Sequence, residues 1–153
     1  MDYPYFPLFI DLSGKTILVV GAGNIALRRI RVLAQFTERL TVIAPETHPE
    51  LEPLESAGKL TVFRKEFEPS DLSGADLVLA ATNDETVNDL IWRCCKELGL
   101  PVNVSSDAKK SDFFFPGVAR KDNFVIGVTA GGKDHAAAKR LTDRARKLLD
   151  ETE

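Results

Sequence analysis

A glycine-rich turn between a buried strand and an amphipathic helix is the feature that most constrains how this chain can fold. Residues 16–20 form a short, mostly β-branched apolar run, as expected of a strand buried on both faces. The run ends in Gly21-Ala-Gly23-Asn-Ile-Ala26, and apolar residues then recur at helical spacing to about Gln35. Since parallel strands are joined through such helices, the sequence predicts an α/β fold with a parallel sheet.

The spacing Gly-x-Gly-x-x-Ala in this strand–turn–helix context is typical of dinucleotide sites. Gly21 would make the tight turn, Gly23 would let the backbone approach a pyrophosphate, and Ala26 would keep the helix close to the strand. The first helical residues, among them Asn24 and Ile25, would present free N–H groups to the phosphates. We therefore predict a Rossmann-type sheet with helices on both faces; the alternative is a turn that binds no nucleotide.

The end of the second predicted strand bears on which dinucleotide binds. An acidic residue about 20 positions after the glycines usually binds the ribose hydroxyls. Glu46, next to Pro45 at the end of the strand at residues 40–44, is the candidate. Residues 44–50 contain no Arg or Lys that would bind a 2′-phosphate. The sequence thus favours NAD over NADP, with Pro45 and Glu46 among the cofactor-binding residues.

The same alternation of strands and helices continues to residue 104. Further strands are predicted at residues 60–63, 75–81 and 102–104, and helices at 47–58 and 84–98. Thr82 and Asn83 follow the fourth strand, so they either line the cofactor or cap the strand end. All five strands belong to one predicted nucleotide-binding domain, residues 1–111.

The pattern changes in the remaining segment, residues 112–153. Two strand-like runs, 112–119 and 123–129, are joined by three residues without a helix between them, which predicts an antiparallel hairpin. Three consecutive phenylalanines in the first run are too apolar for a free edge, so we expect a sheet extension or a dimer interface. A basic amphipathic helix is predicted at residues 135–149.

Composition excludes several functional classes. The formal net charge of −3 argues against a general nucleic-acid binder. No apolar run approaches the ~18–20 residues that span a bilayer, and the first residues lack the pattern of a signal peptide, so a cytoplasmic protein is expected. Cys94 and Cys95 are predicted to be buried free thiols, and with His48 and His135 they give no zinc-ligand spacing. No metal site is therefore predicted.

Several motifs together resemble the siroheme synthase N-terminal family. The lead-in at residues 5–15 resembles that family's Pro-Leu-Phe…Leu-x-Gly-Lys pattern, and the glycine loop continues into Arg28-Arg29 as it does there. Residues 80–84 with Asn88 resemble its Ala-Ala-Thr-(Asp/Asn)-Asp…Asn pattern. Val-Asn-Val at 102–104, Phe113 to Pro116, and Gly131-Gly132 follow in the family order.

This resemblance implies a homodimer that uses NAD⁺ to oxidise precorrin-2 to sirohydrochlorin, with iron insertion as an additional activity of some members. The hairpin would then be the dimerisation segment. The substrate carries eight carboxylates, so it requires local positive charge and polar contacts. The candidates for substrate binding are Arg28, Asn103, Lys109, Lys110, Arg120 and Lys133. For each cation, the alternative is a solvated surface charge.

The chain departs from the family pattern at three points. Ser106 stands where many members have the Asp proposed as general base, so either the neighbouring Asp107 accepts the proton or the proton leaves to solvent. Lys133-Asp134-His135 follows the glycine pair in place of the family residues. The resemblance also implies a further helical segment after residue 153, so we expect a short form, a more open substrate pocket or the loss of one activity. Two hypotheses follow: a dehydrogenase with Ser106 and Asp107 as catalytic candidates, without predicted chelatase activity, or a non-catalytic NAD- or tetrapyrrole-binding module.

Overall fold

The computed structural model describes residues 4–152, and these form two compact units. The first unit is Asp11–Phe113; the second combines the described residues up to Ile10 with those from Phe114 onward. The division that we predicted lies at 111/112 and places the N-terminal residues in the first unit instead. The predicted outer bounds, residues 1 and 153, lie outside the described residues.

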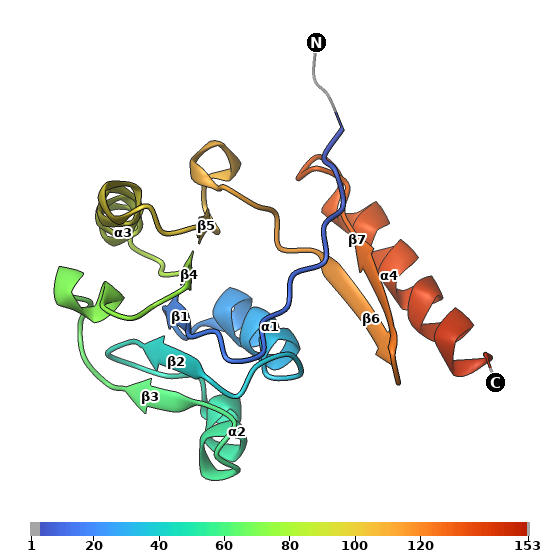
Figure 1. Cartoon of the computed structure of the whole chain (residues 1–153), viewed down its shortest axis with the longest axis horizontal. Coiled ribbons are helices and arrows are strands. Elements are labelled where there is room, and N and C mark those ends of the chain that lie inside the picture. Colours follow the sequence, from blue (N-terminus) through green and yellow to red (C-terminus); the bar gives the residue numbers. More distant parts are fainter. Residues whose placement is uncertain (1–3, 153) are drawn as a thin grey trace. The chain divides into compact units, whose positions relative to one another are not determined.

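The first unit is built on a five-stranded parallel sheet with the order β3-β2-β1-β4-β5 (Figure 1). The chain adds strands on one side of β1, then crosses back to add β4 and β5 on the other side. The order therefore reverses between β1 and β4, where open α/β sheets bind ligands beyond the carboxyl ends of the strands. The strands are β1 (Ile17–Val20), β2 (Leu40–Ile43), β3 (Thr61–Phe63), β4 (Leu77–Ala80) and β5 (Val102–Val104).

Helices cover both faces of this sheet. Because right-handed crossovers that run in opposite directions place their helices on opposite faces, α1 (Asn24–Leu33) and α2 (Glu52–Ser56) lie on one face and α3 (Glu85–Leu98) on the other. The core beneath α3 includes Ile91 and Cys95, both fully buried against β1, β4 and β5. The predicted fold class is confirmed.

Proline shortens the helix that we predicted at residues 47–58. The structure has a 3₁₀ turn, η1 (Pro49–Leu51), followed by the single-turn α2. His48 caps η1, because its Nδ1 accepts a hydrogen bond from Glu50 N at 3.2 Å. Pro53, at the start of α2, has no N–H to donate, so one continuous helical ladder does not form. Two further 3₁₀ turns, η2 (Pro69–Leu72) and η3 (Ala108–Lys110), were not predicted.

The second unit is a hairpin covered by one helix. Strands β6 (Gly117–Lys121) and β7 (Phe124–Val128) pair antiparallel, and α4 (His135–Asp150) packs on them through Ala145 and Leu149. The predicted strand at 112–119 is wrong in its first part, because the three phenylalanines precede β6. Asp112 instead pairs with Val102 through both its N–H and its carboxylate, which anchors this segment to β5.

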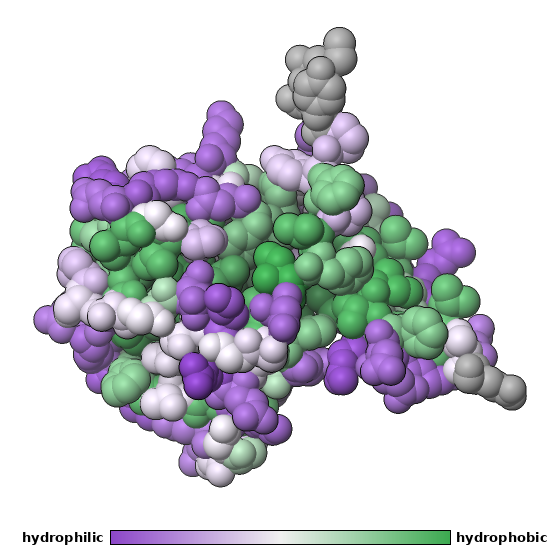
Figure 2. All heavy atoms as spheres, viewed as in Figure 1, coloured by the Kyte–Doolittle hydropathy of each residue, from purple (hydrophilic) through white to green (hydrophobic). Residues whose placement is uncertain are grey.

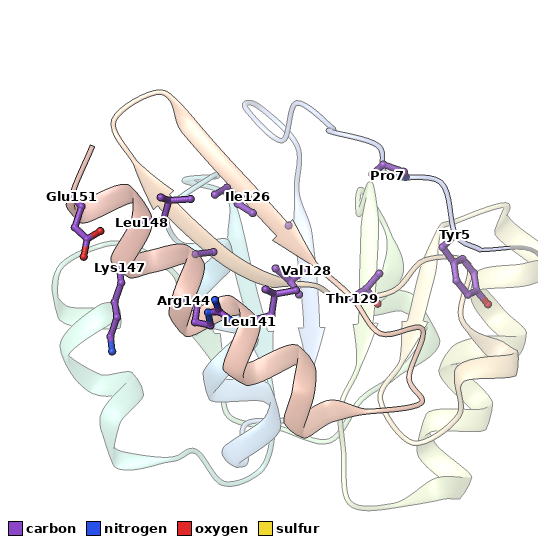
Figure 3. A pocket seen from close by; sticks show the side chains of 12 residues that line it. Tyr5, Pro7, Ile126, Val128, Thr129, Leu141, Arg144, Lys147, Leu148 and Glu151 are labelled. Carbon is purple, nitrogen blue, oxygen red and sulfur yellow. The ribbon is translucent and has the colours of Figure 1, made fainter. Parts of the chain in front are cut away.

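An apolar groove of about 870 Å³ lies between β7 and α4 in the second unit (Figure 3). Ile126 and Val128 line it from the strand, Leu141 and Leu148 from the helix, and Tyr5 from the N-terminal segment. Leu141 and Leu148 are 54% and 60% exposed, so much of this apolar surface faces solvent. Figure 2 shows hydrophobic residues gathered over the hairpin and α4.

Candidate functional site

The candidate site is a cleft of about 760 Å³ at the carboxyl ends of β1, β2 and β4. It is lined by three segments that each follow a strand, residues 20–24, 43–48 and 81–84, together with Glu66, Phe67 and Val87. The cleft therefore lies at the point where the strand order reverses, as the glycine loop predicts. It belongs entirely to the first unit.

Gly21 lets the end of β1 lie against the end of β4. Its φ of 108° is unfavourable for other residues, and a Cβ on it would lie 2.2 Å from the carbonyl oxygen of Ala81. The hydrogen bond from Ala81 N to Val20 O, 2.8 Å long, holds the two strand ends together. No larger residue can replace Gly21 without displacing β4.

Gly23 meets a different requirement, because a Cβ there would contact nothing within 4 Å. Gly23 lines the cleft at the N-cap of α1, whose first turn contains neither an acidic residue nor a capping side chain. The first intrahelical bond is from Leu27 N to Gly23 O, so the N–H groups of residues 24–26 precede it. Open space beside an uncapped helix N-terminus fits the pyrophosphate of a dinucleotide.

The loop after β2 forms the second wall of the cleft. Pro45 and Glu46, both predicted to bind the cofactor, are exposed and line it. His48 N donates a 3.0 Å hydrogen bond to Ala22 O, which ties this loop to the glycine loop. Of the other cofactor candidates, Asn24, Thr82 and Asn83 also line the cleft, whereas Ile25 and the buried Ala26 do not.

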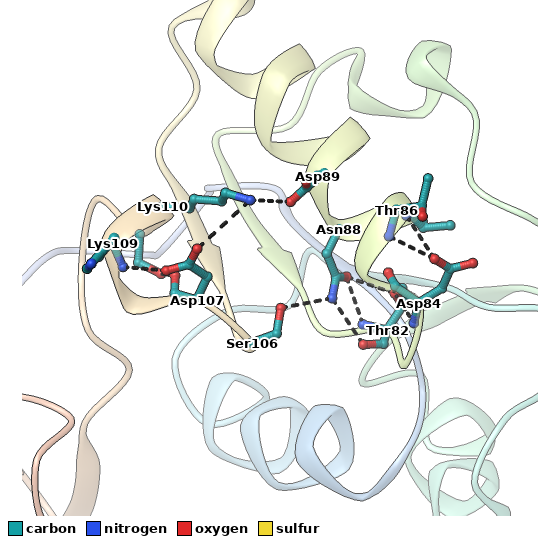
Figure 4. Close-up of polar contacts among 11 residues, drawn as sticks. Thr82, Asp84, Thr86, Asn88, Asp89, Ser106, Asp107, Lys109 and Lys110 are labelled. Atoms are coloured by element: carbon teal, nitrogen blue, oxygen red, sulfur yellow. Dashed lines mark hydrogen bonds and ion pairs between the residues drawn. The ribbon is translucent and has the colours of Figure 1, made fainter.

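A buried amide organises the third wall, at the end of β4 (Figure 4). Asn88, 1% exposed on α3, hydrogen-bonds to the backbone and hydroxyl of Thr82 and to the hydroxyl of Ser106. Asp84 caps α3 by accepting hydrogen bonds from the Thr86 and Val87 N–H groups. The sequence pattern contained Asn88, but we assigned it no role.

The two catalytic candidates after β5 point in different directions (Figure 4). Ser106 faces Asn88, whose Nδ2 lies 3.4 Å from the serine Oγ. Asp107 instead caps η3, since its Oδ1 accepts a hydrogen bond from Lys109 N at 2.9 Å. The other carboxylate oxygen of Asp107 lies 3.9 Å from Lys110 Nζ. Ser106 is therefore the side chain that joins the network at the end of β4.

Asn103 does not fit the substrate-binding role that we predicted. The residue is only 4% exposed, and both ends of its amide are engaged within the first unit. Its Oδ1 accepts from Arg29 Nη1 at 2.5 Å, and its Nδ2 donates to Phe113 O at 2.8 Å. Burial lowers the pKa of Arg29 to about 10. Arg29 follows the buried Ala26 by three residues, so helical periodicity alone indicates that it lies on the inner face of α1.

The predicted cations have different surroundings in the structure. Lys110 forms an ion pair with Asp89 and lies 5.6 Å from the Trp92 ring centroid, while Arg28 and Lys109 are exposed. Arg120 on β6 and Lys133 before α4 belong to the second unit. Among residues 4–152, no group of three or more His, Cys, Asp or Glu side chains is arranged to hold a metal ion.

A family model described as "Putative NAD(P)-binding" matches residues 8–117, which include every residue that lines the cleft. This chain belongs to that family. Siroheme synthase 2 of Aeromonas salmonicida (strain A449) is 39% identical over 145 residues, which are 95% of this chain and 30% of that protein. A siroheme synthase of Saccharophagus degradans is 36% identical over 137 residues, covering 90% and 30%. The chain thus spans 30% of the length of these curated relatives.

A solved structure extends the likeness to both units of the chain. SirC, named as a precorrin-2 dehydrogenase, matches with a TM-score of 0.85 and 28% identity, over 96% of this chain and 72% of its own. Together with the siroheme synthases, this match confirms the resemblance to the siroheme synthase N-terminal family. The predicted cofactor, NAD, is confirmed as well. Within residues 4–152 of this family member, no helix is long and apolar enough to cross a membrane.

Proposed function

We propose that the chain is an NAD-dependent dehydrogenase that oxidises precorrin-2 to sirohydrochlorin. The main observation is the cleft at the strand-order reversal, where the open face of Gly23 adjoins the uncapped N-terminus of α1. The likeness to SirC, over 96% of this chain, supports the substrate class. The proposal includes a cytoplasmic location for the reaction.

Each wall of the cleft has a part in holding the cofactor. The first turn of α1 would bind the pyrophosphate, and Glu46 would accept hydrogen bonds from the ribose hydroxyls. Residues 44–50 hold no Arg or Lys for a 2′-phosphate, which favours NAD over NADP. Bound NAD⁺ supplies the hydride acceptor. Thr82 and Asn83 line the opposite wall of the cleft.

The substrate's carboxylates require cations near this edge of the sheet. Arg28 on α1 and Lys109 in η3 are exposed and available for charge-assisted hydrogen bonds. Lys110 would have to exchange its ion pair with Asp89 for a substrate carboxylate. Arg120 and Lys133, in the second unit, are the remaining candidates. Arg28 and Lys109 are therefore the first cations to test for an effect on substrate KM.

Asp107 is the proposed proton acceptor, because Ser106 is not basic enough to take a proton. Asp107→Asn keeps a side-chain oxygen that can cap η3, so the fold should persist. We expect kcat to fall about 100-fold while the Kd for NAD⁺ stays unchanged. The measurement is steady-state kinetics with a parallel NAD⁺ titration. An unchanged kcat would assign the proton to solvent instead.

We also propose that the chain forms a homodimer through its second unit. The groove between β7 and α4 exposes apolar side chains that a monomer would leave in water, and a second copy would cover them. Iron insertion is not proposed.

The deciding experiment is an anaerobic assay with purified chain, enzymatically generated precorrin-2 and NAD⁺, in which sirohydrochlorin is followed by its absorbance. Turnover that requires NAD⁺ is the expected result. Absence of turnover with NAD⁺ still bound would favour the second candidate, a non-catalytic NAD- or tetrapyrrole-binding module. The observation behind that candidate is Ser106, which stands where family members have the proposed base.

A further inference from the structure

The side chain of Asn88 connects the ends of two neighbouring strands. Its Oδ1 accepts a hydrogen bond from Thr82 N at 3.2 Å and lies 2.8 Å from Thr82 Oγ1, whose single proton has Asn88 Oδ1 and Asp84 O as alternative acceptors. Its Nδ2 donates to Thr82 O at 3.1 Å and lies 3.4 Å from Ser106 Oγ. The oxygen therefore has a backbone donor, and both N–H groups are used. Asn88 thus joins the residue after β4 to the loop after β5.

The backbone of Thr82 fixes which way this amide points. A backbone N–H can only donate and a backbone carbonyl can only accept, so the Asn88 oxygen must face Thr82 N and the nitrogen must face Thr82 O. A flipped amide would place donor against donor and acceptor against acceptor at a residue that is 1% exposed. The nitrogen that faces Ser106 therefore always offers a proton.

This fixed direction polarises the serine hydroxyl. Since the Ser106 oxygen accepts from Asn88, the hydroxyl proton points away from Asn88. Ser106 is exposed at the carboxyl edge of the sheet, and the neighbouring strand end contributes Thr82 and Asn83 to the cleft. The hydroxyl proton is therefore available to a bound molecule.

We infer that Asn88 is a positioning residue that makes Ser106 a hydrogen-bond donor to an oxygen of the bound ligand. This inference rests on the proposed function and deepens it. The oxygen belongs either to a carboxylate of the tetrapyrrole or to the carboxamide of the nicotinamide. Ser106 thus orients the reactants through a neutral donor, and it takes no proton in the reaction.

Ser106→Ala tests the donor, and Ser105→Ala is the matched control on the adjacent residue. Calorimetry would measure the Kd of each variant for NAD⁺, for ADP-ribose, which lacks the nicotinamide, and for precorrin-2 under anaerobic conditions. A loss of about fivefold for NAD⁺ alone identifies the carboxamide, as expected for one neutral hydrogen bond. A loss of about tenfold or more for precorrin-2 identifies a carboxylate. Unchanged values for all three ligands, or equal losses for NAD⁺ and ADP-ribose, would overturn the inference.

The role of Asn88 is tested by a double-mutant cycle with the nearly isosteric Asn88→Leu. If Asn88 acts through Ser106, Ser106→Ala should cost less than about twofold in ligand affinity once Asn88 is replaced. The same cost in both backgrounds would contradict the positioning role. Should Asn88→Leu fail to fold, Asn88→Ser, a smaller polar replacement, completes the cycle.

The binding experiments separate this inference from the proposed function. A wild-type chain that binds neither NAD⁺ nor ADP-ribose would contradict the proposed function before any variant is compared. A wild-type chain that binds NAD⁺ without turnover would still give a result for Ser106, because the three Kd values do not depend on catalysis.

Discussion

Gly21 and Gly23, in the same turn, have opposite steric surroundings. We therefore expect substitution of Gly21 to affect folding and substitution of Gly23 to affect cofactor binding. A methyl group at Gly21 would overlap the backbone of Ala81, whereas a methyl group at Gly23 would extend into the open cleft. We expect Gly21→Ala to lower the free energy of unfolding by about 3 kcal/mol. Gly23→Ala should change it by less than about 0.5 kcal/mol, because the poorer N-cap is offset by the lower entropy of the unfolded chain at a φ of −82° that Ala also adopts.

Urea denaturation of both variants, followed by NAD⁺ titration of the folded ones, measures these effects. Gly23→Ala should bind NAD⁺ at least tenfold more weakly, since its methyl group occupies the space assigned to the pyrophosphate. A Gly21→Ala chain as stable as the wild type would show that β1 and β4 do not need this close approach.

Adjacent thiols should react very differently. Burial, and then the neighbouring Cys94, raise the pKa of the Cys95 thiol to about 12. A raised thiol pKa leaves the neutral, unreactive form dominant at pH 8. We expect iodoacetamide to label only the half-buried Cys94 in the native chain and both thiols in urea. Tandem mass spectrometry locates the adducts, and equal native labelling of the two residues would contradict this burial.

Individual residues were predictable where local geometry sets their role. The spacing of Gly21 and Gly23 identified the nucleotide loop because a tight turn and a close approach both require missing side chains. The contact of Asn103 with Arg29 was not predictable, because the two residues are 74 positions apart in sequence. Polar residue type alone does not distinguish an amide that binds a ligand from one that satisfies a buried guanidinium.

At the scale of elements, the contact between β6 and α4 depends on a small residue. A Cβ at Gly117 would lie 2.2 Å from Thr142 Oγ1, and Thr142 is buried on the inner face of α4. We expect Gly117→Ala to lower the melting temperature by about 2–8 °C, as about 1–2 kcal/mol of overpacking would do.

The second-site variant Thr142→Ala removes the clashing oxygen but leaves its Cβ at 3.1 Å from the new methyl group. Adding it to Gly117→Ala should therefore restore part of the lost stability in thermal unfolding. If the double variant is less stable than Gly117→Ala alone, the clash with Thr142 is not the cause of the lost stability.

The positions of the strands were predicted closely wherever a short apolar run is flanked by turn residues. Strands β1, β2 and β5 lie where periodicity predicts them, because buried parallel strands read as uninterrupted apolar residues. The phenylalanines at 113–115 form an apolar run of the same kind. They nevertheless lie outside β6, because Asp112 pairs with Val102. Such non-local pairing leaves no periodic signal.

For the whole molecule, the proposed dimer gives a direct test. Leu141→Arg combined with Leu148→Arg places two charges in the apolar groove, which a self-association interface would not tolerate. The wild type should sediment as a dimer and this variant as a monomer. Leu98→Arg, at a 61% exposed leucine of α3, is the matched control and should remain dimeric. A dimeric groove variant would place the interface elsewhere.

The sequence could not predict which unit the N-terminal segment joins. Tyr5 packs edge-on against Phe114, with ring centroids 4.3 Å apart, and lies 3.9 Å from the position of a Cβ on Gly131. These partners are separated from Tyr5 by more than 100 positions, and the segment itself carries no helical or strand period. The parallel sheet, by contrast, followed from the alternation of strands and helices along the chain.

This division has a consequence for how the chain acquires its structure during synthesis. The segment at residues 4–10 leaves the ribosome before the nucleotide-binding unit, yet its partners from Phe114 onward leave only after that entire unit. Asp11–Phe113 can complete its sheet while translation continues, and Tyr5 remains without its ring partner Phe114 throughout that time. Tyr5 is thus made before the nucleotide-binding unit but packed after it, and chaperones can bind the segment around it in the interval.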